Sequence, residues 1–209
     1  MKSLLLIFGS GIAMCFFSAC KKKTSEPGPT VAKEKIIEIK TPYGTMYMWL
    51  YKETPQHRAN FLKLAGEGFF DSSTFHRVVS NFVSQGGDPN SKDADSTNDG
   101  FGGPGYTVPA EILSTLKHDY GAVGAARDNN PAKASNGSQF YIVNNSAGYP
   151  SLNNNYTVFG KVFSGIQAAV DMAKVAKNAN NRPYKAIKMD VNVVEKTLEE
   201  LKTEFGFVP

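Results

Sequence analysis

Cysteine is nearly absent from the sequence, and the other groups that usually carry covalent or metal chemistry are dispersed. The only two cysteines among 209 residues, Cys15 and Cys20, lie near the beginning of the chain. From residue 21 onward no thiol is available for a disulfide bond or a zinc site. The three histidines, His57, His76 and His118, form no Glu-x-x-His pair, and no Gly-x-Ser-x-Gly turn presents a serine nucleophile. We therefore expect no metal, no cofactor and no covalent intermediate.

A strong charge of one sign is also lacking. The sequence has 23 basic and 19 acidic residues and a net charge of +4, without the dense basic stripe that a nucleic-acid partner usually needs. Residues 100–105 match the dinucleotide-binding fingerprint, but a polar stretch precedes them and no helical pattern follows, so we reject a nucleotide site. Asp93, Asp95 and Asp99 lack the correctly placed glycine and the closing glutamate of a calcium loop. We expect a solvated acidic loop there.

A long uninterrupted apolar run is missing as well, although the first nineteen residues are mostly apolar. Lys2 precedes apolar stretches at residues 4–8 and 12–17, which a Gly-Ser-Gly interruption keeps short of the ~20 residues of a membrane span. The sequence Phe-Ser-Ala-Cys at residues 17–20 resembles the lipobox at which bacterial lipoproteins are cleaved and lipidated. Residues 1–19 therefore predict a lipoprotein signal peptide rather than an uncleaved membrane helix. Lipid on Cys20 would place the protein in the bacterial cell envelope, on the outer membrane or facing the periplasm.

The region after Cys20 predicts a tether followed by one domain. Residues 20–34 contain lysines at 21–23 and then serine, proline and glycine, which can bury almost nothing. The lysines either rest on anionic headgroups, at about 1 kcal/mol each, or form a solvated flank of the cleavage site. The remaining length suits one domain. We place it at 35–196, with a C-terminal tail at 197–209.

Hydrophobic periodicity predicts a mainly β domain with two helices. Residues 35–40 and 45–51 alternate in the manner of a β-hairpin. Helical patterns cover 55–65, where Thr54 could cap the first turn, and 165–176. Short apolar pieces between turn-rich loops are typical of an all-β barrel; they lie at 74–79, 121–126, 139–143, 156–162 and 187–193.

Three blocks of sequence carry the most specific signal. The first is FHRVVSNFVSQGGD at 75–88, the second is GAVGAAR at 121–127 with NGSQFYI at 136–142, and the third is YTVFGKV at 156–162. In this order they resemble the cyclophilin family of peptidyl-prolyl cis/trans isomerases, and the resemblance covers about residues 35–195. It implies an eight-stranded antiparallel closed barrel capped by two α-helices, with the prolyl site on its outer face.

The same resemblance implies roles for individual residues. Arg77 matches the family's catalytic arginine, while Phe82 and Gln85 match its pocket phenylalanine and its backbone-binding glutamine. Four further residues would bind substrate in the groove and the proline pocket: Ala126, Tyr141, Leu152 and Tyr156. Three positions depart from the common family pattern: Tyr141 replaces a phenylalanine, Tyr156 a histidine, and Ser151 a tryptophan. The pocket is therefore expected to be similar to the family's but not identical.

The implied reaction needs no nucleophile. The two isomers of an X-Pro bond differ by only ~0.5–1 kcal/mol, but amide resonance separates them by a barrier of ~18–20 kcal/mol. A guanidinium aimed at the proline nitrogen would bond better to the twisted amide than to either planar form, and such differential binding is catalysis. We expect a monomer that acts on proline-containing segments of exported proteins during folding. The alternative is a proline-peptide binding module, or a holdase chaperone with little isomerase activity.

Overall fold

The computed structural model describes residues 32–209. The predicted signal peptide, Cys20 and most of the predicted tether lie outside the described residues. The helices and strands are, in chain order, β1 (Lys33–Thr41), β2 (Gly44–Leu50), α1 (Pro55–Gly66), β3 (Arg77–Val78), β4 (Val83–Gly86), η1 (Pro89–Lys92), β5 (Thr107–Val108), β6 (Ala122–Ala125), β7 (Ser135–Asn136), β8 (Phe140–Val143), η2 (Pro150–Leu152), β9 (Val158–Ser164), α2 (Gln167–Met172), β10 (Asp190–Thr197) and α3 (Leu198–Phe205).

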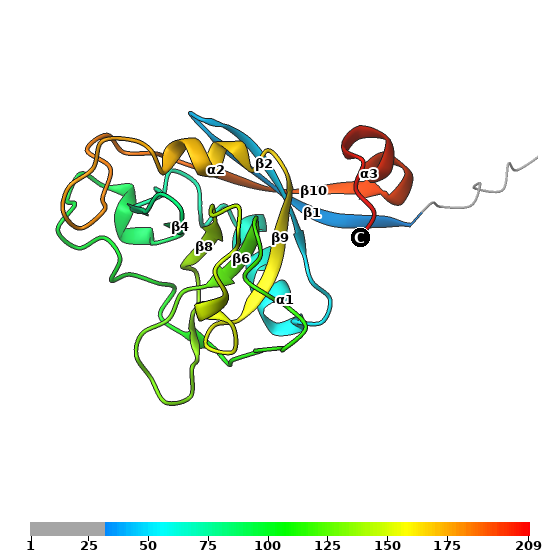
Figure 1. Cartoon of the computed structure of the whole chain (residues 1–209), viewed down its shortest axis with the longest axis horizontal. Helices are drawn as coiled ribbons and strands as arrows, with labels where there is room; N and C mark the ends of the chain where they lie inside the picture. Colours follow the sequence, from blue (N-terminus) through cyan, green and yellow to red (C-terminus); the bar gives the residue numbers. More distant parts are fainter. Residues whose placement is uncertain (1–31) are drawn as a thin grey trace, which may run out of the picture. The chain divides into compact units, whose positions relative to one another are not determined.

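Eight of the strands form one antiparallel sheet in the order β10-β1-β2-β9-β6-β8-β4-β3, which confirms the predicted mainly β architecture (Figure 1). The sheet differs from the expected closed barrel, because its edge strands β3 and β10 do not pair with each other. The edges are instead joined through a bridge between Thr74 and Lys188 and a 2.9 Å hydrogen bond from Phe75 N to Ile187 O. Since β3 is only two residues long, it offers too little backbone to close the ladder.

The predicted hairpin and the first predicted helix are both present. Strand β1 pairs with β2, with Ile37 opposite Met48. Helix α1 begins at Pro55 as expected, but the Thr54 side chain makes no capping hydrogen bond. The carboxylate of Glu111 takes that role, because it accepts hydrogen bonds from the backbone N–H groups of residues 56 and 57 at 3.0 and 2.9 Å. An acidic side chain at this end also complements the helix dipole.

The main hydrophobic core lies between the sheet and helices α1 and α2, which lie on opposite sides of the strands in Figure 1. Alternation along β8 divides its side chains between two clusters: Phe140 and Ile142 belong to the main core, while Tyr141 and Val143 belong to a second cluster on the opposite face. This second face, formed by β3, β4, β8 and β6, is the one that carries the predicted site. Helix α2 is shorter than the expected 165–176.

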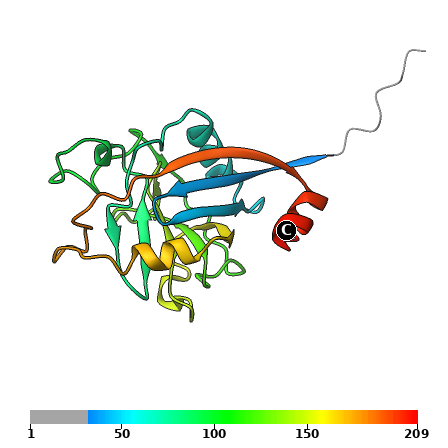
Figure 2. The same cartoon turned by 90° about the horizontal axis from the view of Figure 1, so that it is seen from above.

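Residues 197–209, which we predict to form a C-terminal tail, contain a third helix, α3. Thr197 accepts a hydrogen bond from Glu200 N, and the Glu200 side chain accepts one from Thr197 N, so a capping box begins α3. Leu201 is fully buried and packs in a cluster with Ile36 and Trp49. Figure 2 shows α3 beyond the end of β10, near the start of β1. The helix therefore covers the apolar surface to which Ile36 of β1 and Trp49 of β2 belong.

Candidate active site

All seven residues predicted for catalysis and substrate binding line one pocket of about 270 Å³. The pocket lies on the second face of the sheet, where β3, β4 and β8 are neighbours, and Leu152 at the end of η2 also lines it. Its lining residues are Arg77, Phe82, Val83, Gln85, Ala126, Arg127, Tyr141, Leu152 and Tyr156. The predicted lipidation site, Cys20, lies outside the described residues.

Strand register explains why residues far apart in sequence meet here. Arg77 lies opposite Gln85 in the β3–β4 pair, Gln85 opposite Tyr141 in β4–β8, and Tyr141 opposite Gly124 in β6–β8. These four residues form one row across four strands, and side chains in such a row point to the same face of the sheet. Gly124 has to be a glycine, because a Cβ there would lie 2.3 Å from Cζ of the Tyr141 ring. The row thus places the Arg77 guanidinium at one end and the Tyr141 ring, which lies over Gly124, at the other.

The guanidinium of Arg77 is held by a chain of side-chain amides. Arg77 Nη1 donates to Gln85 Oε1 at 3.2 Å, and Gln85 Nε2 donates to Gln139 Oε1 at 3.1 Å. Gln139 Nε2 then donates to the backbone oxygens of Gly100 and Gly102 at 3.0 and 2.8 Å. Sequence reasoning missed Gln139, although it lies in the NGSQFYI block. Gln85 therefore orients Arg77 in addition to its predicted contact with the peptide backbone.

The apolar walls of the pocket are fixed from outside it. The Phe82 ring packs against Tyr149 at a centroid distance of 4.3 Å, and the Arg77 guanidinium lies 5.5 Å from the Phe82 ring centre. Buried Asn144 accepts a hydrogen bond from Phe82 N at 2.9 Å, so the turn that carries this phenylalanine is tied to the end of β8. Leu152 belongs to the same apolar cluster. The result is an apolar pocket with a charged rim, which suits a proline ring whose amide lies at the arginine.

The opposite rim is formed by Ala126, Arg127 and Tyr156. The Arg127 guanidinium lies 4.8 Å from the Tyr156 ring centre, and its Nε donates to the backbone oxygen of Asn155 at 3.0 Å. Ala126 N donates to Gln139 O at 2.9 Å, which fixes the edge of the groove to the strand that carries Tyr141. The tyrosine at 156 thus lies in the pocket, at the position where the family often has histidine.

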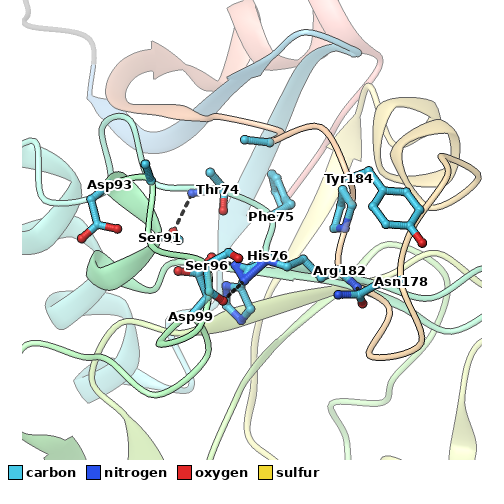
Figure 3. A pocket seen from close by; sticks show the side chains of 13 residues that line it. Thr74, Phe75, His76, Ser91, Asp93, Ser96, Asp99, Asn178, Arg182 and Tyr184 are labelled. Atoms are coloured by element: carbon cyan, nitrogen blue, oxygen red, sulfur yellow. Dashed lines mark hydrogen bonds and ion pairs between the residues drawn. The ribbon is translucent and has the colours of Figure 1, made fainter.

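Two further cavities lie along the segment from residue 91 to residue 101, and one of them adjoins the pocket. One of about 520 Å³ shares Arg77 and Gln85 with the pocket, and the next, of about 350 Å³, contains His76, Asp99 and Arg182 (Figure 3). The prediction of a solvated loop at this position is wrong for the side chain of Asp99. That side chain is 7% exposed and forms an ion pair with Arg182, because a carboxylate removed from water needs a partner.

No helix in residues 32–209 is long and apolar enough to cross a membrane. Within the same range no group of three or more His, Cys, Asp or Glu side chains is placed to hold a metal ion.

A barrel-like antiparallel sheet with an arginine-rimmed apolar pocket on its outer face defines the class of cyclophilin-like prolyl isomerases. A sequence model of the family "Cyclophilin type peptidyl-prolyl cis-trans isomerase/CLD" matches residues 36–193. The chain belongs to this family, and the predicted enzyme class, peptidyl-prolyl cis-trans isomerase, is confirmed.

Curated relatives and solved structures agree with this assignment. The chain is 46% identical over 126 residues to peptidyl-prolyl cis-trans isomerase B of Bacillus subtilis, covering 59% of this chain and 80% of that protein. It is 35% identical over 157 residues to peptidyl-prolyl cis-trans isomerase ppi1 of Schizosaccharomyces pombe, covering 73% and 94%. A Cryptosporidium parvum cyclophilin type isomerase, crystallised in the presence of the dipeptide Ala-Pro, superposes with a TM-score of 0.67 at 28% identity, covering 78% and 99%.

Proposed function

We propose that this isomerase works without a covalent step, by donating from Arg77 to the nitrogen of a twisted X-Pro amide while the pocket holds the proline ring. The observation that carries the proposal is the cross-strand row, in which Gln85 fixes the guanidinium at the rim of an apolar pocket. Phe82, Leu152 and Tyr141 form the walls that would hold the ring. Arginine suits the role because its charge is permanent and its donors lie in a rigid plane.

The energies required are within reach of such a site. An acceleration of ~10⁴-fold needs about 5.5 kcal/mol of differential stabilisation. One hydrogen bond from a charged donor typically contributes ~1.5–3 kcal/mol. Clamping of the ring and removal of water from the amide must supply the rest, which is why the walls matter as much as the arginine.

The decisive experiment is a prolyl-peptide isomerisation assay on residues 21–209 with Arg77→Ala. We expect kcat to fall by at least tenfold, since a hydrogen bond made mainly in the twisted state is lost, with unchanged circular dichroism. Arg77→Lys should also be poor, because a point charge does not reproduce the planar fork. Arg58→Ala on α1, away from the pocket, is the charge-matched control and should retain parental activity. Near-parental kcat in a folded Arg77→Ala variant would refute the mechanism.

The second part of the proposal concerns place and substrate: a lipid on Cys20 would anchor the enzyme in the cell envelope, where it assists folding of exported polypeptides. Slow prolyl steps of ~10–100 s can limit such folding. Residues 21–32 separate Cys20 from the start of β1. Twelve residues span at most ~40 Å when extended, so a monomeric domain would work close to the membrane surface.

The anchor is tested by mass spectrometry of the mature amino terminus and by fractionation of a Cys20→Ser variant. We expect a lipidated Cys20 in the parent, and release from the membrane or stalled processing in the variant. An unmodified residue at position 20 would contradict the proposal. Catalysis by the isolated domain should be the same for both.

A proline-peptide binding module or holdase remains the second candidate, because the same pocket would bind prolyl peptides without accelerating their isomerisation. The Arg77–Gln85–Gln139 chain favours the enzyme, since binding of a proline ring does not by itself require an oriented guanidinium. A parent protein that binds prolyl peptides but shows no isomerase activity would favour the module.

A further inference from the structure

We infer that His118 is a positioning residue of the proline pocket, which fixes the Tyr141 wall through its side chain and the Tyr149–Asn153 segment through its backbone. The inference rests on the proposed function of that pocket. His118 is 1% exposed and does not line the pocket itself. Its Nε2 lies 2.9 Å from the Tyr141 hydroxyl, and its Nδ1 lies 3.0 Å from Asn153 Oδ1.

The surroundings of His118 determine which ring nitrogen carries the proton. The backbone N–H of His118 also donates to Asn153 Oδ1, at 2.9 Å, so this atom of the amide is the oxygen and can only accept. Nδ1 must therefore be the donor, which leaves Nε2 of the neutral ring as an acceptor. Burial lowers the pKa of His118 and keeps the ring neutral at pH 7. It follows that the Tyr141 hydroxyl donates to Nε2.

This bond sets the position of the Tyr141 ring. The ring is 5% exposed, stacks on His118 at a centroid distance of 5.9 Å, and meets the edge of Tyr156 at 6.0 Å. The hydroxyl oxygen lies over Gly124, where a side chain would collide with it. Because the hydroxyl is held by His118, the wall offered to a proline ring is the aromatic face rather than a polar group.

The backbone of the same residue holds two more walls. His118 O accepts a hydrogen bond from Tyr149 N at 2.7 Å, and Tyr149 packs against Phe82. Asn153, which His118 holds by two hydrogen bonds, directly follows the pocket residue Leu152. Three walls of the pocket thus depend on one buried histidine.

These contacts predict a specific kinetic effect. A wall that touches the proline ring binds the substrate in the planar as well as in the twisted state, so its displacement should raise KM, whatever fall in kcat accompanies it. Loss of folded protein would lower apparent kcat and leave KM unchanged. A change in KM therefore separates positioning from general stability.

The test compares His118→Leu, Tyr141→Phe and the double variant in the isomerisation assay, at a temperature where all are folded. We expect each single variant to raise KM roughly tenfold, because each leaves a buried polar group without its partner. The double variant removes both polar atoms together, and its KM should return to within about threefold of the parent. The matched control is His57→Leu. His57 is another buried histidine with two side-chain partners, Glu111 and Ser135, and it lies outside this pocket.

The outcomes separate this inference from the proposed mechanism. An unchanged KM in His118→Leu, a double variant no better than His118→Leu, or an equal rise in KM in His57→Leu would each overturn it. The arginine mechanism is tested by the kcat of Arg77→Ala. If it fails, the KM values of the His118 and Tyr141 variants still test the inference. If the parent lacks isomerase activity, the Kd of an Ala-Pro peptide measured by NMR replaces KM. The ¹⁵N shifts of the His118 ring should show a protonated Nδ1 and an unprotonated Nε2; the reverse assignment would also overturn the inference.

Discussion

Acidification should destabilise the fold below pH 6.5 through His76, the neighbour of Arg77. His76 is 6% exposed, and neither of its ring nitrogens makes a hydrogen bond of good geometry within residues 32–209. Burial is the main cause that lowers its pKa from 6.5 to about 4; Asp88 and a weak contact with the Thr74 backbone oppose this shift, whereas Arg182 and Arg77 add to it. The ring is therefore neutral in the folded protein at pH 7.

The sign and size of the effect follow from this difference in pKa. Between pH 6.5 and about 4 the unfolded chain binds the proton and the folded chain does not, so stability falls as the pH falls. A difference of about 2.5 units corresponds to roughly 3 kcal/mol in total, of which about 2 kcal/mol is lost by pH 5. Above pH 6.5 this contribution is fully present. A loss of this size is a large fraction of the ~5–15 kcal/mol that stabilises a typical domain.

The assay is urea unfolding at pH 7.5, 6 and 5, with His76→Phe as a variant of similar volume that does not titrate. We expect the parent to lose about 2 kcal/mol more than the variant between pH 7.5 and 5. An NMR titration of the His76 ring in the folded protein measures its pKa directly, whatever the stability of the variant. Equal losses in both proteins, or a His76 pKa near 6.5, would refute the reasoning.

Three further predictions concern single side chains. Burial raises the pKa of Glu111, but hydrogen bonds from His57 and Gln56 outweigh it and hold that pKa below its ordinary value. Glu111→Gln should therefore lower the free energy of unfolding by ~1–3 kcal/mol, measured with urea at pH 7.5, and leave kcat/KM unchanged. Gln139→Leu removes the support of Gln85 and should lower kcat/KM roughly tenfold, as one lost hydrogen bond predicts; parental activity would mean that Arg77 is oriented without it. In the cyclophilin family the tryptophan at the position of Ser151 donates its indole N–H to the inhibitor cyclosporin and packs against it. Ser151→Trp should therefore make cyclosporin bind roughly tenfold to a hundredfold more tightly, as measured by titration of isomerase activity.

The fold was predictable wherever a local pattern was strong. The β1–β2 hairpin followed from alternation and helix α1 from helical spacing. Strands β6, β8 and β9 followed from short apolar pieces between turn-rich loops. The cap of α1 was not predictable in the same way, because Glu111 is 54 residues from His57 in sequence and only the tertiary fold brings them together. Helix α3 did carry a local signal: the capping box of Thr197 and Glu200 stands in the sequence directly before Leu201.

The pocket was predictable because the family blocks fix the register of three neighbouring strands, and the register then brings Arg77, Gln85 and Tyr141 into one row. The side chains that hold this row in place were not predictable in the same way, because Gln139 and His118 bind residues that are 54 and 23 positions away in the sequence. One sequence signal nevertheless points to His118. A tyrosine in a buried position where the family has phenylalanine brings a hydroxyl that must find a partner. Such a departure from the family pattern therefore predicts a compensating polar side chain elsewhere in the chain, and in this structure His118 supplies it.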